Sequence, residues 1–411
     1  MDGLVDPRKR RDYAVSELVT AALMMFIFRQ GSRNQMNLCR KEKRFRRNYR
    51  RLFKLRLPHM DTVDELLAEL DPSELERLKA GLVRVLIGKK VFNRFRLGRS
   101  YVVSVDATHV ASYERDYCGQ CVWKTVGKGD HKRKVWMHYV LEAKLVTSSG
   151  LSISLASEWI ANSGAAYHKQ DCELKAFVRL AAKLKSFFPR LAICITGDGL
   201  YPNATVFKIC GEYGWDFIFT FRDGNLPSVW EEVHLLGHNP QREKRIERTT
   251  KACRTTTTYR WLNGIDYQKY KLNWIEARIE YTDTRTGELT KQRFVHVTNL
   301  NITSDQAPVI SQAGRMRWKI ENQGFNDQKN QGYQLGHKFS ETSFNALQNY
   351  YQCLQIAHLI NQLVIHSTTV NELLKQDKTL TVKFLWRKLI SFMDEGNLEN
   401  MQKRRCQIRL A

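Results

Sequence analysis

An aspartate inside an apolar strand constrains this chain more than any other single feature. Residues 101–106 read Tyr-Val-Val-Ser-Val-Asp, a pattern typical of a buried β-strand. A carboxylate in such a strand is costly unless it is paired with a cation or bound to a metal. We therefore expect Asp106 to lie at a functional site in a fold whose central strand leads to that site.

The segments that follow predict an α/β core. Strands are expected at 135–146 and 151–157, a helix at 171–188, a strand at 191–195, a short helix at 204–213 and a strand at 215–221. The first three strands can pair as a meander. This order of elements is the one expected of a ribonuclease-H-like core, a mixed sheet flanked by helices.

The rest of the chain divides around this core. We predict a helical DNA-binding domain at 1–98, the first part of the core at 99–223, a β-rich insertion at 224–300, the remaining core helix at 301–340 and a C-terminal helical region at 341–411. Helix starts are predicted by a capping box at Thr62–Glu65 and by Asp71 before Pro72. Later helices are expected at 310–330, 343–367 and 370–393.

The charge balance favours a polyanionic partner. The chain has 66 Lys and Arg against 42 Asp and Glu, a formal net charge of +24, and nucleic acid is the polyanion that such a surplus most often serves. The alternative is charge that only maintains solubility. Residues 40–56 combine many cations with an apolar seam, which predicts a helix that contacts DNA phosphates through Arg46, Arg47 and Arg50. The alternative there is a solvated helix face.

No feature predicts a membrane protein. The apolar stretch at 14–28 is interrupted by Glu17 and Thr20 and is too short to span a bilayer, so a buried amphipathic helix is expected. Nine cysteines scattered along the chain fit a reducing compartment. The expected location is the bacterial cytoplasm, in association with the nucleoid.

Three carboxylates form the candidate catalytic set. Asp106 lies in the first strand, Asp198 directly follows the fourth, and Glu321 lies in the helix after the insertion. Each also has a structural alternative, respectively a salt bridge, a turn cap and a solvated helix face. Phosphodiester cleavage by two Mg²⁺ ions, for which Mn²⁺ can substitute, needs oxygen ligands of this kind. All three residues are therefore predicted metal ligands.

The sequence around Glu321 supplies candidate DNA contacts. Arg317 lies four residues before Glu321, so on a continuous helix the two share a face, and the guanidinium can hold either the carboxylate or a DNA phosphate. Arg315 is a second cation on this segment. Lys329 lies about 80° from that face, but its long side chain can reach DNA.

With these residues the chain resembles the DDE transposases of bacterial insertion sequences, in particular insertion-sequence family four. That family carries a Tyr-Arg-Glu-Lys signature. Arg317 and Glu321 match its spacing, whereas Gly314 occupies the tyrosine place and Gln328, followed by Lys329, the lysine place. The resemblance covers about residues 104–340 and includes the phrases at 197–201 and 315–326.

The resemblance implies cleavage of double-stranded DNA at element ends and transfer of the 3′ hydroxyls to target DNA, by a homodimer on paired ends. By likeness to some relatives, Trp318 is expected to stack on a flipped base; the alternative is a buried core tryptophan. Two other functions remain open, a ribonuclease-H-like nuclease without strand transfer and a catalytically silent DNA-binding regulator.

Two further motifs carry weaker signals. Cys118 and Cys121 have a spacing found in zinc sites, with His131 or His138 available as a further ligand, but a second cysteine pair is absent. His109, three residues after Asp106, is expected either near the metals or as a hydrogen-bonded structural histidine.

Overall fold

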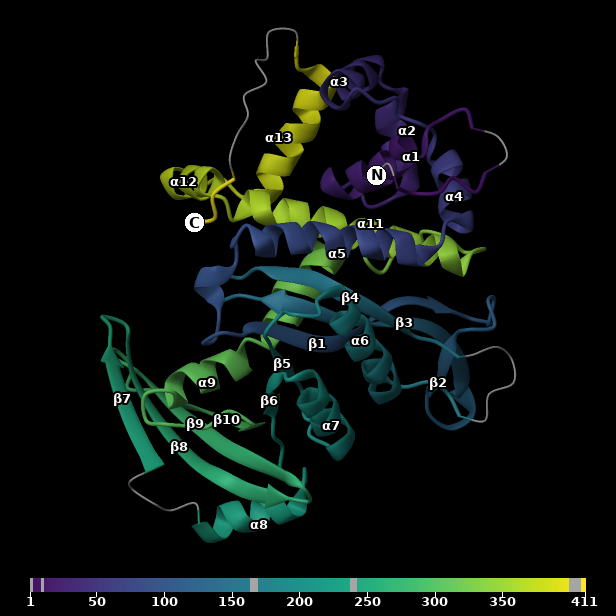
Figure 1. The fold of residues 1–411 in the computed structure, drawn as a ribbon. Helices are drawn as coiled ribbons and strands as arrows, with labels where there is room; N and C mark the ends of the chain where they lie inside the picture. Colours follow the sequence, from purple (N-terminus) through teal and green to yellow (C-terminus); the bar gives the residue numbers. More distant parts are fainter. Residues whose placement is uncertain (1–2, 9–10, 163–168, 237–241, 399–407) are drawn as a thin grey trace.

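The computed structural model describes residues 3–8, 11–162, 169–236, 242–398 and 408–411. Its centre is a mixed ten-stranded sheet in which the strands follow the order β2-β3-β1-β5-β6-β10-β9-β8-β7, with β4 paired to β3. Helices cover both faces of the core sheet (Figure 1). The chain is therefore a mixed α/β protein, as the sequence predicts.

The first strands form the expected meander. β1 (Tyr101–Tyr113) pairs antiparallel with β3 (Arg133–Val146), and β3 pairs antiparallel with β4 (Ser152–Ile160). β5 (Ile193–Gly197) joins β1 in parallel, and β6 (Asp216–Thr220) joins β5 in parallel. The strand β2 (Val122–Val126), which pairs with the beginning of β3, was not predicted.

Alternation along β1 and β5 separates the two faces of the core sheet. Val103 and Val105 pack with α6 (Glu173–Phe187) and α7 (Ala204–Tyr213) in one apolar cluster. Val102 and Cys194 pack instead with α9 (Ala307–Arg315). Even-numbered residues at the ends of β1 and β5 therefore face α9 and the segment that follows it.

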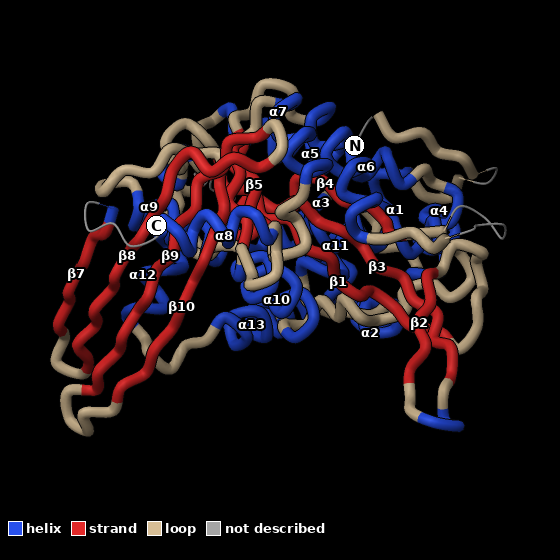
Figure 2. Tube along the Cα trace, turned by 90° about the horizontal axis from the view of Figure 1, so that it is seen from below, coloured by secondary structure: helices blue, strands red, loops and turns tan. Residues whose placement is uncertain are grey.

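The β-rich insertion extends the core sheet. It contains α8 (Pro227–Leu236), β7 (Glu243–Thr249), β8 (Cys253–Tyr267), β9 (Tyr270–Asp283) and β10 (Leu289–Thr298). β10 pairs antiparallel with β6, which joins the insertion to the core sheet. The β character is confirmed, but the insertion does not form a sheet of its own. Figure 2 shows these strands projecting at one end of the molecule and the β2–β3 hairpin at the other.

Helices from both ends of the chain form a second layer. This layer contains α1 (Val15–Ile27), α2 (Arg33–Lys41), α3 (Lys43–Phe53), α4 (Met60–Glu69), α5 (Pro72–Gly88) and the long α11 (Phe344–Ile365). α1, α4 and α5 contact α11, and α3 lies further from the sheet, beside α13 (Val382–Glu395) (Figure 1). The side chains of α1, α4 and α11 share one apolar core. No helix in the described ranges is long and apolar enough to cross a membrane.

Several predicted helix limits were wrong. Asp71 caps α5 as predicted, but α4 begins at Met60 after His59, so Thr62 lies inside the helix. The predicted helix at 40–56 is interrupted at Glu42, between α2 and α3. The predicted helix at 370–393 is two helices, α12 (Thr368–Gln376) and α13 (Val382–Glu395). The domain limits themselves stay predictions, and residues 399–407 of the last region lie outside the described residues.

The helix predicted at 310–330 is confirmed over most of its length, but it is not a continuous α-helix. α9 ends at Arg315, a turn follows, and residues Ile320–Phe325 form a π-helical turn that leads into α10 (Asn326–Asn330). Because a π-helical turn has a different residue spacing from an α-helix, residues four apart no longer share a face. Arg317 and Glu321 are therefore not an i, i+4 helical pair.

Candidate active site

The parallel register of β1 and β5 positions Asp106 beside Asp198. Ser104 pairs with Thr196, and the two hydroxyl oxygens of this pair are 2.7 Å apart. Asp106 and Asp198 each lie two residues further along neighbouring strands, which are about 4.8 Å apart in a β-sheet. The pairing thus places both carboxylates side by side, where β5 ends and β1 continues beyond its parallel partner.

Each of the two aspartates has an arginine partner. Arg317, in the turn after α9, lies 3.4 Å from Asp106 Oδ2 through its Nη1. Arg222, in the loop after β6, donates from Nη2 to Asp198 Oδ2 at 3.0 Å. The remaining oxygens accept backbone N–H groups, from Ala107 to Asp106 and from Leu200 to Asp198. The ion pair of Arg317 is thus with Asp106 and not with Glu321, the partner considered from the sequence.

Asp106 is held in an environment that favours its protonated form. The side chain is only 25% exposed, and burial raises the pKa of Asp106 to about 6 although Arg317 lowers it. The negative charges of Glu173 and Glu321 raise it further. Asp106 therefore shares a field with two other acidic side chains.

Glu173 is an acidic residue at this site that the sequence reasoning missed. It lies in the first turn of α6, and its Oε1 accepts a hydrogen bond of 2.7 Å from Tyr201. Burial and the charge of Asp198 raise the pKa of Glu173, while the Tyr201 hydroxyl and Arg317 lower it. A Cβ atom at residue 197 would lie 2.6 Å from the Tyr201 ring, so Gly197 lets this tyrosine pack against the end of β5.

Glu321 enters from the π-helical turn. It is the second residue of that turn, which packs against β1 and β4, and its side chain is half-buried. Single-turn π-helical segments occur frequently at functional sites. Glu321 therefore joins Asp106, Asp198 and Glu173 in one acidic neighbourhood contributed by four separate elements.

Packing explains both departures from the Tyr-Arg-Glu-Lys signature. A Cβ atom at Gly314 would lie 2.5 Å from the His296 ring and 2.9 Å from Ile218, which leaves no room for a tyrosine. Gln328 is fully buried and exchanges two hydrogen bonds with Gln355 of α11, at 2.9 and 3.1 Å. The adjacent Lys329 is exposed.

Cationic and aromatic side chains border the acidic group. Trp318 is 50% exposed, so the buried alternative was wrong, and the Arg317 guanidinium lies 4.5 Å from the centre of its ring. Arg315 lies 4.3 Å from the Phe294 ring centre. Arg315 and Trp318 line two cavities of about 460 and 780 Å³, the first with Arg222, Arg293 and Arg317 and the second with Arg248 and Lys319. An anionic chain in either cavity would meet several guanidinium groups.

The predicted cations of the N-terminal region lie elsewhere. Arg46, Arg47 and Arg50 are exposed on α3, across α11 from the sheet (Figure 1). They line a groove of about 830 Å³ together with Arg40, Lys43, Arg51, Lys54 and Arg56. The structure thus has two separate cationic surfaces.

Of the two roles expected for His109, the structure shows the hydrogen-bonded one, with His109 Nε2 2.7 Å from Ser112 Oγ.

The acidic group suits hard cations in its chemistry. Carboxylate oxygens are the ligands that Mg²⁺ and Mn²⁺ prefer, and each oxygen of Asp106 and Asp198 keeps a second lone pair beside its present donor. Among the described residues, however, the three-residue group whose ligand atoms all lie within 4.8 Å of one another is Cys118, Cys121 and His138. The carboxylates must approach one another, away from Arg317 and Arg222, to share ions.

Comparisons with known proteins add little to this geometry. No protein-family model matches the sequence, and no curated protein matches it. A cryo-EM structure of a piggyBac transposase synaptic complex with hairpin DNA resembles the chain at a TM-score of 0.38 and 12% identity, over 72% of this chain and 53% of that one. The chain thus spans about half the length of that protein.

Proposed function

We propose that this protein is a DDE transposase, which cuts the ends of an insertion sequence and joins the 3′ hydroxyls to target DNA. The observation that carries the proposal is the parallel register that brings Asp106 and Asp198 side by side where β5 ends. The half-buried Glu321 close by completes the carboxylate set. The order of elements from β1 to β6 and the β-rich insertion agree with a ribonuclease-H-like core of the kind found in insertion-sequence family four.

The proposed ligands are Asp106, Asp198 and Glu321, with Glu173 as a fourth carboxylate. Two Mg²⁺ ions about 3.5 to 4 Å apart would activate the attacking oxygen and stabilise the leaving one. Asp106 must be ionised to serve as a ligand. With a pKa of about 6 it is largely ionised at neutral pH, and a bound cation would lower that pKa. Arg317 and Arg222 hold the two aspartates before metal binds and can then turn to phosphate oxygens.

DNA would be held by the cations around this edge. The Nε–H of Arg317 is buried without a hydrogen-bond partner among the described residues, so it has a donor to offer a phosphate. Arg315 and Lys329 would add phosphate contacts, and the half-exposed Trp318 would stack on a base. Arg46, Arg47 and Arg50 would bind a second stretch of DNA. A homodimer on paired ends, associated with the nucleoid in the cytoplasm, belongs to the same proposal.

One observation favours a second function, that of a catalytically silent DNA-binding regulator. Both aspartates of the site are paired with arginines. If those pairs persist in the presence of Mg²⁺ and DNA, the carboxylates have a structural role only. Basic surfaces would then bind DNA without cutting it.

Cleavage and strand transfer separate these functions. The purified protein is incubated with Mg²⁺ and a duplex that carries the terminal DNA of the element encoding it, and cut strands are measured. A precut end with a free 3′ hydroxyl is then offered with a supercoiled plasmid. We expect cutting and joining by the intact protein, and loss of both in Asp106→Ala, Asp198→Ala and Glu321→Ala with DNA binding retained.

The matched control is Asp305→Ala, because Asp305 is 98% exposed and pairs with Lys244 and not with the residues of the acidic group. This variant should cut as the intact protein does. Cutting without joining would indicate a nuclease, and tight binding without cutting would indicate the regulator. Undiminished cutting in one of the three alanine variants would remove that residue from the proposed set.

A further inference from the structure

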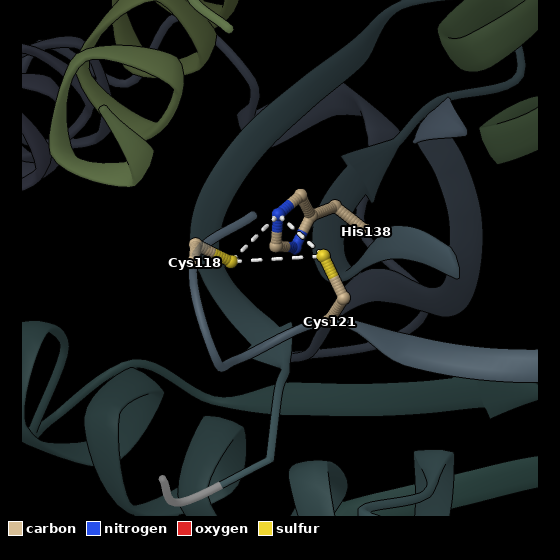
Figure 3. A group of neighbouring side chains, drawn as sticks. All are labelled: Cys118, Cys121 and His138. Atoms are coloured by element: carbon tan, nitrogen blue, oxygen red, sulfur yellow. Dashed lines mark hydrogen bonds between the residues drawn. The ribbon is translucent and has the colours of Figure 1, made fainter. Parts of the chain in front are cut away.

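Two cysteines and a histidine converge at the base of the β2–β3 hairpin, away from the acidic group. Cys118 and Cys121 lie in the loop between β1 and β2, and His138 lies on β3 (Figure 3). The two Sγ atoms are 3.6 Å apart, and His138 Nε2 lies 3.4 Å from each. His131, the other histidine considered from the sequence, is exposed at the hairpin tip.

These distances match a tetrahedral metal site. With metal–sulfur bonds of about 2.3 Å and metal–nitrogen bonds of about 2.0 Å, ligands at tetrahedral angles lie about 3.8 Å apart for two sulfurs and about 3.5 Å for sulfur and nitrogen. A disulfide requires about 2.05 Å between the sulfurs, and both cysteines are free. The triangle therefore fits a shared ion better than a bond between the sulfurs.

We infer that Cys118, Cys121 and His138 bind one structural Zn²⁺, with Asp116 at the fourth position. Two thiolates and an imidazole select zinc over Mg²⁺, which prefers oxygen ligands. Asp116 Oδ1 lies 4.0 Å from Cys118 Sγ and accepts the backbone N–H groups of Cys118 and Gly119, so the carboxylate is already turned towards the cysteine loop.

The surroundings of the three clustered ligands are those of a buried structural site. His138 is fully buried and stacks on Phe344 of α11 with ring centres 4.3 Å apart. Cys121 is also buried, and Asn162 Nδ2 donates to its carbonyl oxygen at 2.7 Å. Structural zinc sites have all four positions filled by protein, whereas catalytic ones keep one open. The site thus links the β1–β2 loop, β3 and, through Phe344, α11.

The ion would brace a cationic hairpin. β2 begins at Val122, the residue after Cys121, and its pairing with β3 runs from Met137 to Arg133. The hairpin beyond carries the exposed cations Lys124, Lys128, Lys132, Arg133 and Lys134. Fixing both strands at the base would hold these charges in one orientation. This zinc site does not depend on the proposed catalytic function.

Metal content tests the inference directly. The full chain is expressed with zinc in the medium, purified with a thiol reductant, and analysed for metals. We expect one zinc ion per chain, with loss of zinc in Cys118→Ser, Cys121→Ser and His138→Asn. The matched controls Cys172→Ser and His131→Asn replace exposed residues of the same types outside the cluster and should keep the ion.

A second measurement keeps the test decisive if those variants fail to fold. Zinc in the intact protein is exchanged for Co²⁺, whose spectrum reports thiolate ligands and tetrahedral geometry. Zinc-free protein, or Co²⁺ bound without thiolate bands, would overturn the site. A mass lower by two hydrogens, with no metal, would show a disulfide instead. Asp116→Asn should weaken zinc binding, and unchanged affinity would remove Asp116 as the fourth ligand.

Discussion

Asp106 shows how burial and neighbouring charges act together on a single carboxylate. Burial disfavours its charge, Arg317 offsets part of that cost, and Glu173 and Glu321 add to it. A cation that enters the group would relieve the repulsion among these acids. The carboxylates therefore lower the stability of the fold without metal and would favour binding of the ion.

This electrostatic cost predicts a pH-dependent effect of Asp106→Asn. The pKa of Asp106 is about 6 in the folded state and lower in the unfolded chain. At pH values between these two pKa values, Asp106 is protonated in the folded protein but ionised in the unfolded chain. Its stabilising contribution is present at low pH and is lost as pH rises through about 6. We compare the free energy of unfolding of the variant with that of the intact protein. This difference should shift by about 2 kcal/mol in favour of the variant when the pH is raised from 4 to 7.

Denaturant unfolding at several pH values without divalent metal measures this change. Loss of the ion pair with Arg317 also changes the free energy of unfolding. This contribution is taken as constant across the pH range, so it cancels when values at different pH are subtracted. Asp305→Asn provides the control at an exposed site and should follow the intact protein. A free-energy difference that stays flat from pH 4 to pH 7 would contradict the assigned burial effect.

Glu173 offers a second test at the residue scale. The Tyr201 hydroxyl lowers the pKa of Glu173, so Tyr201→Phe should raise it. A proton then competes with the ion at higher pH, and the midpoint of the pH dependence of Mg²⁺ binding should move upward. Glu173→Gln should weaken Mg²⁺-dependent cutting by roughly 10- to 100-fold. Binding that follows the same pH dependence in Tyr201→Phe would speak against Glu173 as a ligand.

The sequence predicted part of this neighbourhood for physical reasons. Asp106 lies within one recognisable apolar strand and Asp198 directly follows another, and a polar residue at such a position marks a functional site. Glu173 sits in an ordinary first helical turn, where acids are common for helix-dipole reasons alone. Arg222 reaches Asp198 across a loop. Neither residue is marked by a pattern in the nearby sequence. Their places at the site could therefore be found only from the tertiary structure.

At the scale of elements, the segment from α9 to α10 was the least predictable. Apolar spacing there suits one helix, yet a turn interrupts the helix at 316–317 and a π-helical turn replaces regular α-helix at Ile320–Phe325. Gly324 is part of the reason, since a Cβ atom there would lie 3.0 Å from Ser152 Oγ. Close packing on β4 thus favours a local geometry that periodicity alone does not reveal.

The basic helix α3 yields a prediction about DNA affinity. Arg46, Arg47 and Arg50 are exposed, and each phosphate contact contributes about 0.9 to the slope of log K against log salt concentration. Replacing all three by Gln should lower that slope by roughly 2 to 3 and weaken binding similarly for all DNA sequences. Fluorescence anisotropy with a random-sequence duplex at several salt concentrations measures both.

The control replaces three exposed lysines on other elements, Lys208, Lys271 and Lys378, by Gln. This control variant also loses three positive charges, but it keeps every side chain that lines the groove on α3. An equal loss of slope in both triple variants would mean that net charge, and not the α3 surface, determines binding.

At the scale of the whole molecule, the two helical ends and the sheet are joined through buried charge. Lys79 of α5 donates to Ser154 and Ser157 of β4, at 2.8 and 2.9 Å. Lys144 of β3 donates to Gln355 of α11 at 3.0 Å. Burial lowers the pKa of both lysines, and that of Lys144 to about 8. The segments predicted as separate domains therefore share one interior.

Glu142 supplies the negative charge that keeps this interior stable. It is fully buried, accepts hydrogen bonds from Ser157 and from Tyr351 of α11, and raises the pKa of both lysines against the effect of burial. Glu142→Gln keeps the shape but removes the larger of the two opposite charges acting on each buried ammonium group, leaving Glu76 for Lys79 and Asp327 for Lys144. The expected loss of unfolding free energy at neutral pH is about 3 to 5 kcal/mol.

The sign of the pH effect identifies the cause. In the variant the lysines should have still lower pKa values, so the folded state binds fewer protons than the unfolded chain below about pH 10. The loss of unfolding free energy in Glu142→Gln, relative to the intact protein, should therefore become smaller as pH rises from 7 towards 10. Adding Lys144→Met to Glu142→Gln removes one of the two buried positive charges and should restore part of the stability. A deficit that is independent of pH and unrelieved by Lys144→Met would point to altered packing instead of charge.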